Sequence, residues 1–210
     1  MSEIGKYART LAIQEGWLCL DFANTAEWHA SDQPSEQLES YTELVEWAQG
    51  RGLLRPDEAE GLLRLAGQRA EQATAVLGKA IDLRETIYRL FSAHAQGQPG
   101  APADLDELNR SLAAGAEHFR IVPGQTGYVW EWQAAEGAWD PMLWAVARSA
   151  AELLTSEDLA RVGQCADDRG CGWLFLDSSR NHSRRWCFME NCGNRAKARS
   201  HDERKHKEFE

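Results

Sequence analysis

The sequence predicts a mainly α-helical domain that contains a small β-hairpin element, followed by a compact cysteine-rich unit. Between residues 40 and 160, several segments repeat apolar residues every three or four positions, as helices do. Two strand-like runs flank a turn rich in Gly and Pro, and four of the five cysteines lie in the last fifty residues. The 210 residues suffice for one sizeable core and a small second unit. We expect domains at 1–160 and 161–210.

The first elements are read from apolar runs and capping residues. Residues 16–25 form an apolar run that is too short to decide between a buried strand and the start of a helix. Residues 26–39 are polar, and we expect a loop there. Ser40 followed by Glu43 has the pattern of a capping box, which predicts that a helix begins at this point.

Further helices follow in the middle of the chain. Residues 55–58 combine an early proline with two acidic residues, which is typical of a helix start. A longer helix is predicted over about 72–95, because its apolar residues mostly recur every three or four positions. Asp104 is expected to cap a short helix after a Gly- and Pro-containing loop.

The second half of the domain holds the predicted hairpin. Residues 118–122 and 128–132 flank the turn 123–127 and are expected to pair. A helix is predicted over about 141–154 from its inward-facing apolar residues. A Thr or Ser is then expected to cap a short helix over 157–162.

The cysteines predict a metal site. The first residues show no signal peptide and no membrane span, so we expect a cytoplasmic location and no membrane partner. In a reducing compartment, clustered cysteines favour metal over disulfides. Zn²⁺ prefers a tetrahedron of thiolates or imidazoles, while a redox switch built from the same thiolates is a second interpretation. The predicted zinc ligands are Cys165, Cys171, Cys187 and Cys192.

The spacing of these cysteines also predicts a local fold. Residues 173–176 and 185–189 can form the two strands of a hairpin, and residues 177–182 are typical of a turn. After Cys192, the residues from Gly193 onward favour a helix. This order of turn, hairpin, turn and helix resembles a treble-clef-like zinc finger.

The charge of the chain is unevenly distributed. The formal net charge is −10, which at first argues against nucleic acid. Residues 161–210, however, carry eleven Lys and Arg against eight Asp and Glu, and the stretch 180–207 carries nine against three. Arginine and lysine bond phosphates, and arginine also bonds guanine edges. The sequence therefore predicts DNA as a partner, contacted by Arg180, Arg184, Arg185, Arg195, Lys197 and Arg199.

The same cations have a second interpretation. A helix over 195–207 would place Arg195 and Arg199 near one face, where they could pair with nearby acids instead of DNA. Arg184 and Arg185 could brace the finger from inside. If Arg195 and Arg199 were held in ion pairs against the N-terminal domain, that would argue against DNA contact.

These residues also carry a family resemblance. The segments WLFLDSSRN and RRWCFMENCGNRAKAR resemble the CGNR-type zinc finger, named for the tetrapeptide found here at 192–195. Upstream, GWLCLDFANT, IDLRETIYRLFSAH and SAAELLTSEDLARVGQC resemble the ABATE domain, which precedes this finger in bacterial proteins described as stress-induced transcription regulators. The resemblance implies that the four clustered cysteines bind zinc and that the finger contacts DNA.

A polar cluster in the N-terminal half is a candidate ligand site. Asp21, Asn24, Thr25 and Trp28 could line a small-molecule pocket and make the domain a sensor. The alternative is that the first three serve the local backbone as caps and turn ties. Trp130 and Trp132, which alternate on a predicted strand, could likewise line an aromatic pocket or cover the core.

The sequence thus favours one function among three. It predicts a DNA-binding transcription regulator whose N-terminal domain senses a ligand or forms a homodimer, since one small finger binds DNA weakly. Alternatively, the finger is a structural or protein-docking module on a small-molecule-binding domain, or a thiol-based zinc redox sensor. We find no nucleophile elbow, phosphate loop or dinucleotide fingerprint, and therefore expect no enzyme.

Overall fold

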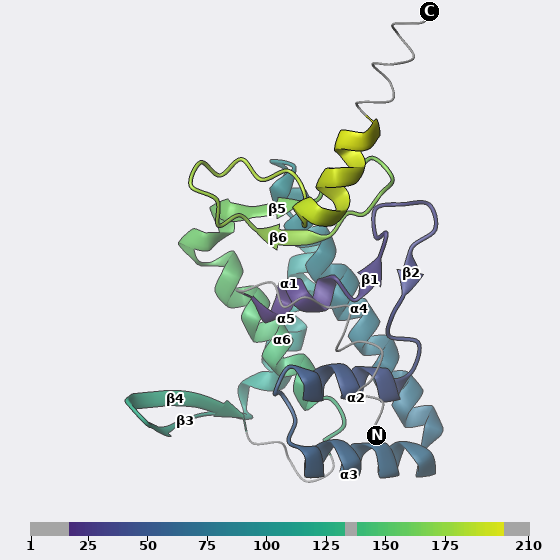
Figure 1. Ribbon diagram of the computed structural model, residues 1–210. Coiled ribbons are helices and arrows are strands. Elements are labelled where there is room, and N and C mark those ends of the chain that lie inside the picture. Colours follow the sequence, from purple (N-terminus) through teal and green to yellow (C-terminus); the bar gives the residue numbers. More distant parts are fainter. Residues whose placement is uncertain (1–16, 133–137, 200–210) are drawn as a thin grey trace, which may run out of the picture.

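The computed structural model describes residues 17–132 and 138–199, except for the side chains of residues 129–132. Within these ranges the chain is mainly helical, and its strands form three two-stranded sheets, which confirms the predicted fold class. Figure 1 shows the cysteine-rich unit, with strands β5 and β6 and the yellow helical segment, at one end of the helical body. None of the helices in the described ranges is both long enough and apolar enough to span a membrane.

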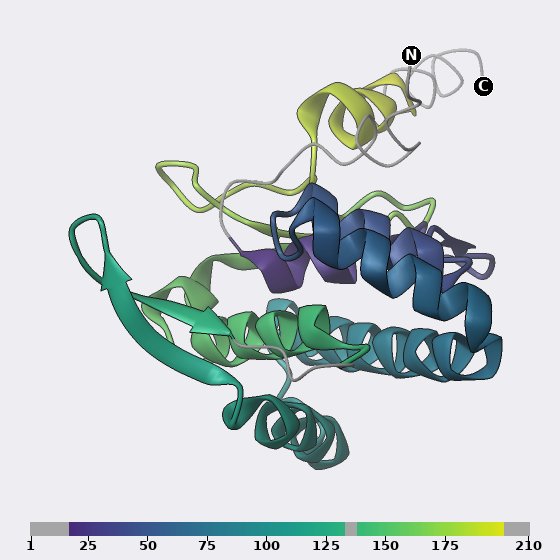
Figure 2. The ribbon, with the colours of Figure 1, turned by 90° about the horizontal axis from the view of Figure 1, so that it is seen from below.

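The core is built around the long helix α4 (Ala70–Ala95). Helix α1 (Leu18–Ala23) packs against both α4 and α6 (Pro141–Leu154), as Figure 2 shows from below. Cys19 and Phe22 of α1 are fully buried. The apolar run at 16–25 is therefore a helix rather than a strand. A helix satisfies its backbone hydrogen bonds within itself, which suits a buried segment that pairs with no strand in the described part of the chain.

Two shorter helices, α2 (Tyr41–Gly50) and α3 (Pro56–Gln68), pack against α4. The predicted capping box is confirmed, because the Ser40 hydroxyl accepts from the Glu43 N–H and the Glu43 carboxylate accepts from the Ser40 N–H. The segment 26–39, predicted as a loop, contains one short strand pair, β1 (Ala26–Glu27) with β2 (Ser35–Glu36).

Helix α5 (Pro102–Ala116) corrects the predicted role of Asp104. Asp104 lies inside the first turn and does not cap the helix; the N-cap is Ala101, and Pro102 occupies the first turn. Proline starts the helix earlier because its backbone φ is already helical and it has no N–H to satisfy. The Asp104 carboxylate instead accepts a hydrogen bond of 2.6 Å from Arg89 on α4.

The predicted hairpin is confirmed as β3 (Phe119–Gly124) paired with β4 (Gly127–Trp132). Figures 1 and 2 both show it projecting away from the helices. The side chains of Trp130 and Trp132 lie outside the described part, so the two interpretations of these tryptophans stay open.

The segment after α6 differs from the expectation. It is a 3₁₀ helix, η2 (Glu157–Arg161), and the Ser156 side chain does not cap it. The Ser156 hydroxyl donates back to the Leu153 carbonyl, and the Thr155 hydroxyl donates back to Ala151. Both hydroxyls thus satisfy carbonyls at the end of α6, which a helix terminus leaves open.

The finger forms a hairpin and a helix, as predicted, but with one different strand. β6 (Leu174–Leu176) pairs with β5 (Val162–Gln164), which precedes the first cysteine, and residues 185–189 form no strand. Only one backbone bond links residue 185 to the first turn, from the Ala166 N–H to the Arg185 carbonyl. The chain then enters a π-helical turn, η3 (Met189–Gly193), and a helix that covers 194–199.

Candidate metal centre and its surroundings

The four clustered cysteines come from four different positions in the finger. One follows β5, one precedes β6, one lies in an irregular segment, and one lies in η3. Their Sγ atoms all lie within 4.8 Å of one another, and all four residues are buried. Two of the Sγ–Sγ distances are 3.6 Å. A ZnS₄ tetrahedron with bonds of about 2.3 Å has edges of about 3.8 Å. The residues are Cys165, Cys171, Cys187 and Cys192.

This geometry suits Zn²⁺ in both donor type and spacing. The sulfur atoms of Cys165 and Cys171, together with burial, raise the pKa of the Cys187 thiol far above its ordinary value. Four thiolates at this separation repel one another, and a divalent cation bound between them offsets that repulsion.

A buried carboxylate supports the cluster from one side. The Asp167 side chain is fully buried and accepts hydrogen bonds from Arg195 at 2.8 and 3.0 Å and from Arg199 at 3.2 Å. Burial raises the pKa of Asp167, but the bonds from Arg195, from the Arg169 N–H and from Arg199 outweigh it, so the pKa lies well below its usual range. Arg195 also donates to the Cys192 Sγ at 2.8 Å.

Arg195 and Arg199 are therefore committed to ion pairs, as the second interpretation of the sequence proposed. Their partner is not the N-terminal domain, because Asp167 belongs to the finger itself. Arg199 also pairs with Asp168. The guanidinium of Arg195 does reach the N-terminal domain, where it lies 5.2 Å from the ring centroid of Trp28.

Arg184 is an internal strut. Its guanidinium donates to the Trp186 carbonyl at 2.9 Å and to the Cys187 carbonyl, and it lies 4.5 Å from the ring centroid of Phe175. The Asp177 carboxylate accepts from the Arg184 backbone N–H at 2.8 Å, which closes the turn before it. The conformation of the segment that carries Cys187 thus depends on Arg184.

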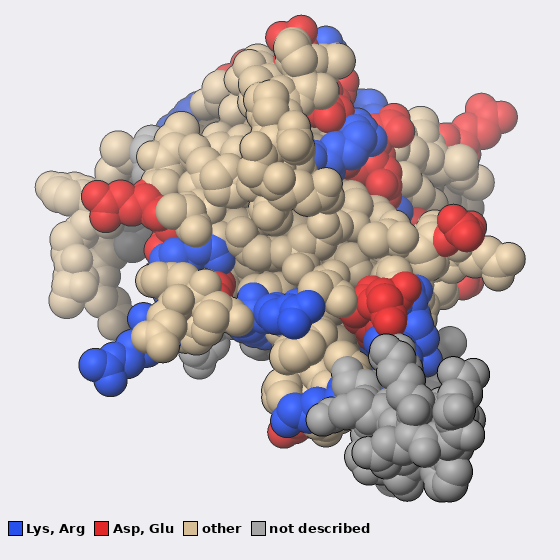
Figure 3. Space-filling model, turned by 90° about the horizontal axis from the view of Figure 1, so that it is seen from above, with Lys and Arg blue, Asp and Glu red and all other residues tan. Residues whose placement is uncertain are grey.

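The other predicted DNA-contacting cations are exposed. Arg180, Arg185 and Lys197 are exposed to solvent, and Arg185 stacks 5.3 Å from the ring centroid of Trp186. Figure 3 shows the face that carries the finger, where Lys and Arg side chains form several separate groups with Asp and Glu between them. The six predicted contacts therefore divide into three exposed cations and three that brace the finger.

The first turn of the finger docks onto the segment 26–31. The His29 and Ala30 N–H groups donate to the carbonyls of Cys171 and Gly170, each at 3.1 Å. Gly170 and Gly172 have φ values of +86° and +67°, in the left-handed region, and a Cβ on Gly172 would approach Ala30 to 2.6 Å. Glycine is required here by both backbone conformation and space.

The polar cluster predicted as a ligand site mainly serves the fold. The Asn24 side chain pairs with the backbone of Leu174, donating to its carbonyl at 2.8 Å and accepting from its N–H at 2.9 Å. Thr25 donates to the Phe22 carbonyl, and Asp21 pairs with Arg51. None of these three lines the cavity described next, whereas Trp28 does.

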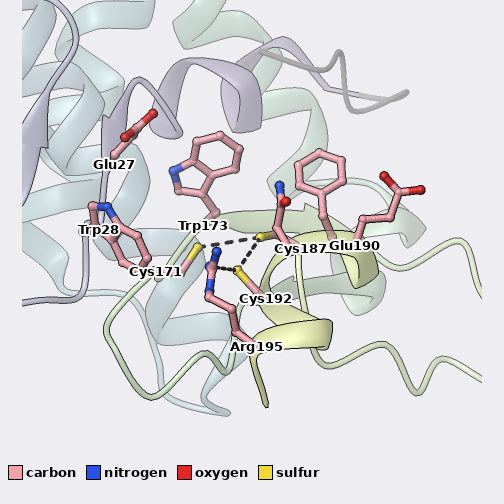
Figure 4. Close-up of a pocket in the computed structure, with 10 residues that line it drawn as sticks. Glu27, Trp28, Cys171, Trp173, Cys187, Glu190, Cys192 and Arg195 are labelled. Atoms are coloured by element: carbon pink, nitrogen blue, oxygen red, sulfur yellow. Dashed lines mark hydrogen bonds between the residues drawn. The ribbon is translucent and has the colours of Figure 1, made fainter. Parts of the chain in front are cut away.

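A cavity of about 360 Å³ opens beside the sulfurs. Figure 4 shows Cys171, Cys187 and Cys192 together at Trp173, with Glu27 and Glu190 on either side of that indole in this view. Sequence reasoning missed Glu27, Trp173, Phe188 and Glu190 as lining residues. Their only signal in the sequence is that three of them lie within four residues of a cysteine and the fourth lies next to Trp28.

Comparison with known families identifies both parts of the chain. A model of the ABATE family, described as "Putative stress-induced transcription regulator", matches residues 16–157. A model of the CGNR zinc finger matches residues 161–205. A search of curated proteins finds no match. With the ABATE match spanning more than half of its length and a buried four-cysteine cluster that suits Zn²⁺, the chain belongs to the ABATE family of transcription regulators and carries a C-terminal CGNR zinc finger.

Proposed function

We propose that this protein is a DNA-binding transcription regulator, in which residues 161–210 form the DNA-contacting domain and residues 1–160 form a domain that senses a ligand or dimerises. The family description supports regulation of transcription. A regulator of this bacterial type acts in the cytoplasm, where the DNA is. The four clustered cysteines hold Zn²⁺ in a closed structural site, since four protein ligands leave no open coordination position.

The observation that carries the proposal is that some cations of the finger are held by hydrogen bonds inside it, whereas others are exposed to solvent. Arg184, Arg195 and Arg199 are held by carbonyls and carboxylates, whereas Arg180, Arg185 and Lys197 are exposed. Among the described residues, no hydrogen bond or ion pair holds the side chains of the exposed three. Exposed cations on a rigid, metal-supported scaffold are suited to phosphate contact.

The test is the binding of the full-length, zinc-loaded protein to a fluorescent random-sequence duplex, measured by anisotropy at several salt concentrations. Three phosphate contacts contribute about −2.7 to the slope of log K against log salt concentration. Binding that weakens with salt at this slope or more steeply supports the proposal. Absence of binding at low salt by protein with a full complement of zinc contradicts it.

A second candidate function is favoured by how firmly the finger is attached. Asn24 pairs with Leu174, and the Trp173 indole N–H donates to the Ala26 carbonyl at 3.0 Å. These bonds suit a structural or protein-docking module, fixed on a domain that does something else. The same titration separates the two, since a purely structural finger gives no salt-dependent binding to duplex DNA.

A further inference from the structure

The cavity beside the sulfurs has walls that take no part in holding zinc. Three cysteines close part of it, and the remaining walls come from two regions of the chain. Glu27 and Trp28 belong to the part matched by the ABATE model, whereas Trp173, Phe188 and Glu190 belong to the finger. Its volume of about 360 Å³ lies within the range of small-molecule sites.

The aromatic walls are held in fixed orientations. Trp173 donates its indole N–H to the Ala26 carbonyl at 3.0 Å. The rings of Trp173 and Phe188 meet edge to face, with centroids 6.3 Å apart and planes at 70°. An aromatic ring presents negative charge on its face, so a cavity lined by such rings attracts a cation.

The backbone of Trp28 adds a second, independent observation. Its φ is +55°, in a region that residues other than glycine rarely adopt. Such conformations persist where the surrounding structure imposes them, and they cluster at binding sites. The Trp28 ring already attracts cations, with the guanidinium groups of Arg169 and Arg195 at 5.0 and 5.2 Å from its centroid.

The charges around the cavity are predominantly negative. Glu27 and Glu190 are its two carboxylates, and four thiolates with one Zn²⁺ add a net charge of about −2. Arg195 is the cation among the lining residues, but its guanidinium is bonded to Asp167 and to Cys192. An anionic ligand would therefore meet repulsion here. The side-chain oxygens of Glu27, Glu190 and Asn191 are few beside the roughly six to eight oxygen ligands that Ca²⁺ takes, and the other walls are largely aromatic.

We propose that this cavity binds a small organic cation, such as an amine, a quaternary ammonium or a guanidinium compound. The π faces of Trp173 and Phe188 contact the cation, and Glu27 and Glu190 supply the opposite charge. Because the walls come from both matched regions, a bound cation strengthens the contact between them. The proposal concerns ligand binding alone and does not depend on DNA binding.

The test is isothermal titration calorimetry of the full-length, zinc-loaded protein with choline, ethylammonium and methylguanidinium. The control ligand is 3,3-dimethyl-1-butanol, which has the shape of choline without its charge. We expect at least one of the cations to bind, and choline to bind more tightly than its neutral counterpart if choline is the one. Absence of heat from all three cations at millimolar concentration overturns the proposal, as does equal binding of the neutral alcohol.

Variants then locate the binding site. Glu190→Gln and Trp173→Leu should each weaken binding of the best cation by about fivefold or more, whereas Glu157→Gln, an exposed acid outside the cavity, should not. Glu190 is exposed, so its replacement leaves the finger folded even if Trp173→Leu does not; zinc content verifies both. If Glu190→Gln and Glu157→Gln both bind as the unaltered protein does, the assignment to this cavity is wrong. Binding to duplex DNA is measured in a separate titration. Failure of the organic-cation proposal is therefore distinguishable from failure of the DNA-binding proposal.

Discussion

The carboxylate of Asp167 and the guanidinium of Arg195 link the two halves of the zinc finger. Asp167 lies two residues after Cys165, and Arg195 lies three residues after Cys192. Two hydrogen bonds of 2.8 and 3.0 Å join them, and Arg195 also donates to the Cys192 sulfur. The pair therefore holds the first turn of the finger against its helix in the neighbourhood of the metal. Groups that orient metal ligands in this way tune the affinity of the site.

Replacing Asp167 with Asn should weaken zinc binding without removing a ligand. The amide is neutral and leaves two guanidinium groups short of an anionic partner, so we expect zinc affinity to fall by about 10- to 100-fold. Competition with a chromogenic chelator measures it. Asp168→Asn is the matched control, because Asp168 is largely exposed and its ion pair with Arg199 contributes little. Equal losses in the two variants would contradict the linking role of Asp167.

Replacing Cys187 with Ser should abolish stoichiometric zinc binding. A serine hydroxyl is a far poorer zinc ligand than a thiolate, and the finger loses the folding free energy that metal binding provides. Elemental analysis of the purified variant should show less than one zinc per chain and amide hydrogen exchange should be faster in the finger. Cys19→Ser is the control, since Cys19 lies in the helical core and is fully buried; it should keep its zinc.

The zinc ligands and the buried Cys19 show how much of the structure the sequence could predict. The cluster was predictable because clustered cysteines in a reducing compartment leave few chemical options, and a lone cysteine in an apolar run favours burial. Helix boundaries followed from local signals such as the capping box at Ser40 and the proline at position 56. Local chemistry carries that information without knowledge of the tertiary fold.

The strand pairing in the finger, the partners of its arginines and the cavity depend on long-range contacts that the sequence pattern does not reveal. Strand β6 pairs with β5 rather than with 185–189, because the Arg184 side chain donates to the Trp186 and Cys187 carbonyls of the latter segment. Arg195 and Arg199 brace the finger because Asp167 lies beside them in the fold, although it is 28 residues away from Arg195 in the sequence. The cavity depends on the docking of 26–31 onto the finger. In each case several partners are equally plausible from the local sequence, and only the tertiary structure determines which one is contacted.

The exposed cations should govern DNA affinity. Replacing Arg180, Arg185 and Lys197 with Ala removes three positive charges from the finger, so the slope of log K against log salt concentration should become shallower by about 2.7. Anisotropy with a random duplex measures the slope, and zinc content shows that the finger remains folded.

The matched control removes the same charge from the helical body. Arg64, Lys79 and Arg110 are exposed there, and their replacement by Ala should leave the slope unchanged. If both triple variants shift the slope equally, the effect reflects net charge rather than a finger surface. If neither does, the DNA contact lies elsewhere in the chain.

The thiol of Cys19 should be inert until the protein unfolds. Burial is the largest effect and raises its pKa from 9.0 to about 12. Because the folded pKa is raised, this group leaves stability unaffected below pH 9.0 and lowers it as pH rises from 9.0 towards 12. At pH 8, iodoacetamide should modify Cys19 only after denaturation, as peptide mass spectrometry would show. Modification of the native protein at that pH would contradict the burial.

Replacing Asn24 with Ala should loosen the finger from the helical body. The amide of Asn24 makes both hydrogen bonds to the Leu174 backbone that a neighbouring strand would make, and Ala leaves two buried backbone groups unsatisfied. We expect a loss of about 2 kcal/mol or more in the free energy of unfolding, measured with urea. Asn109→Ala, on the exposed face of α5, is the control and should change it by about 0.5 kcal/mol or less. The same loss in both variants would show that Asn24 does not anchor the finger, and faster amide exchange confined to residues around Leu174 in Asn24→Ala alone would locate the anchor at this pair.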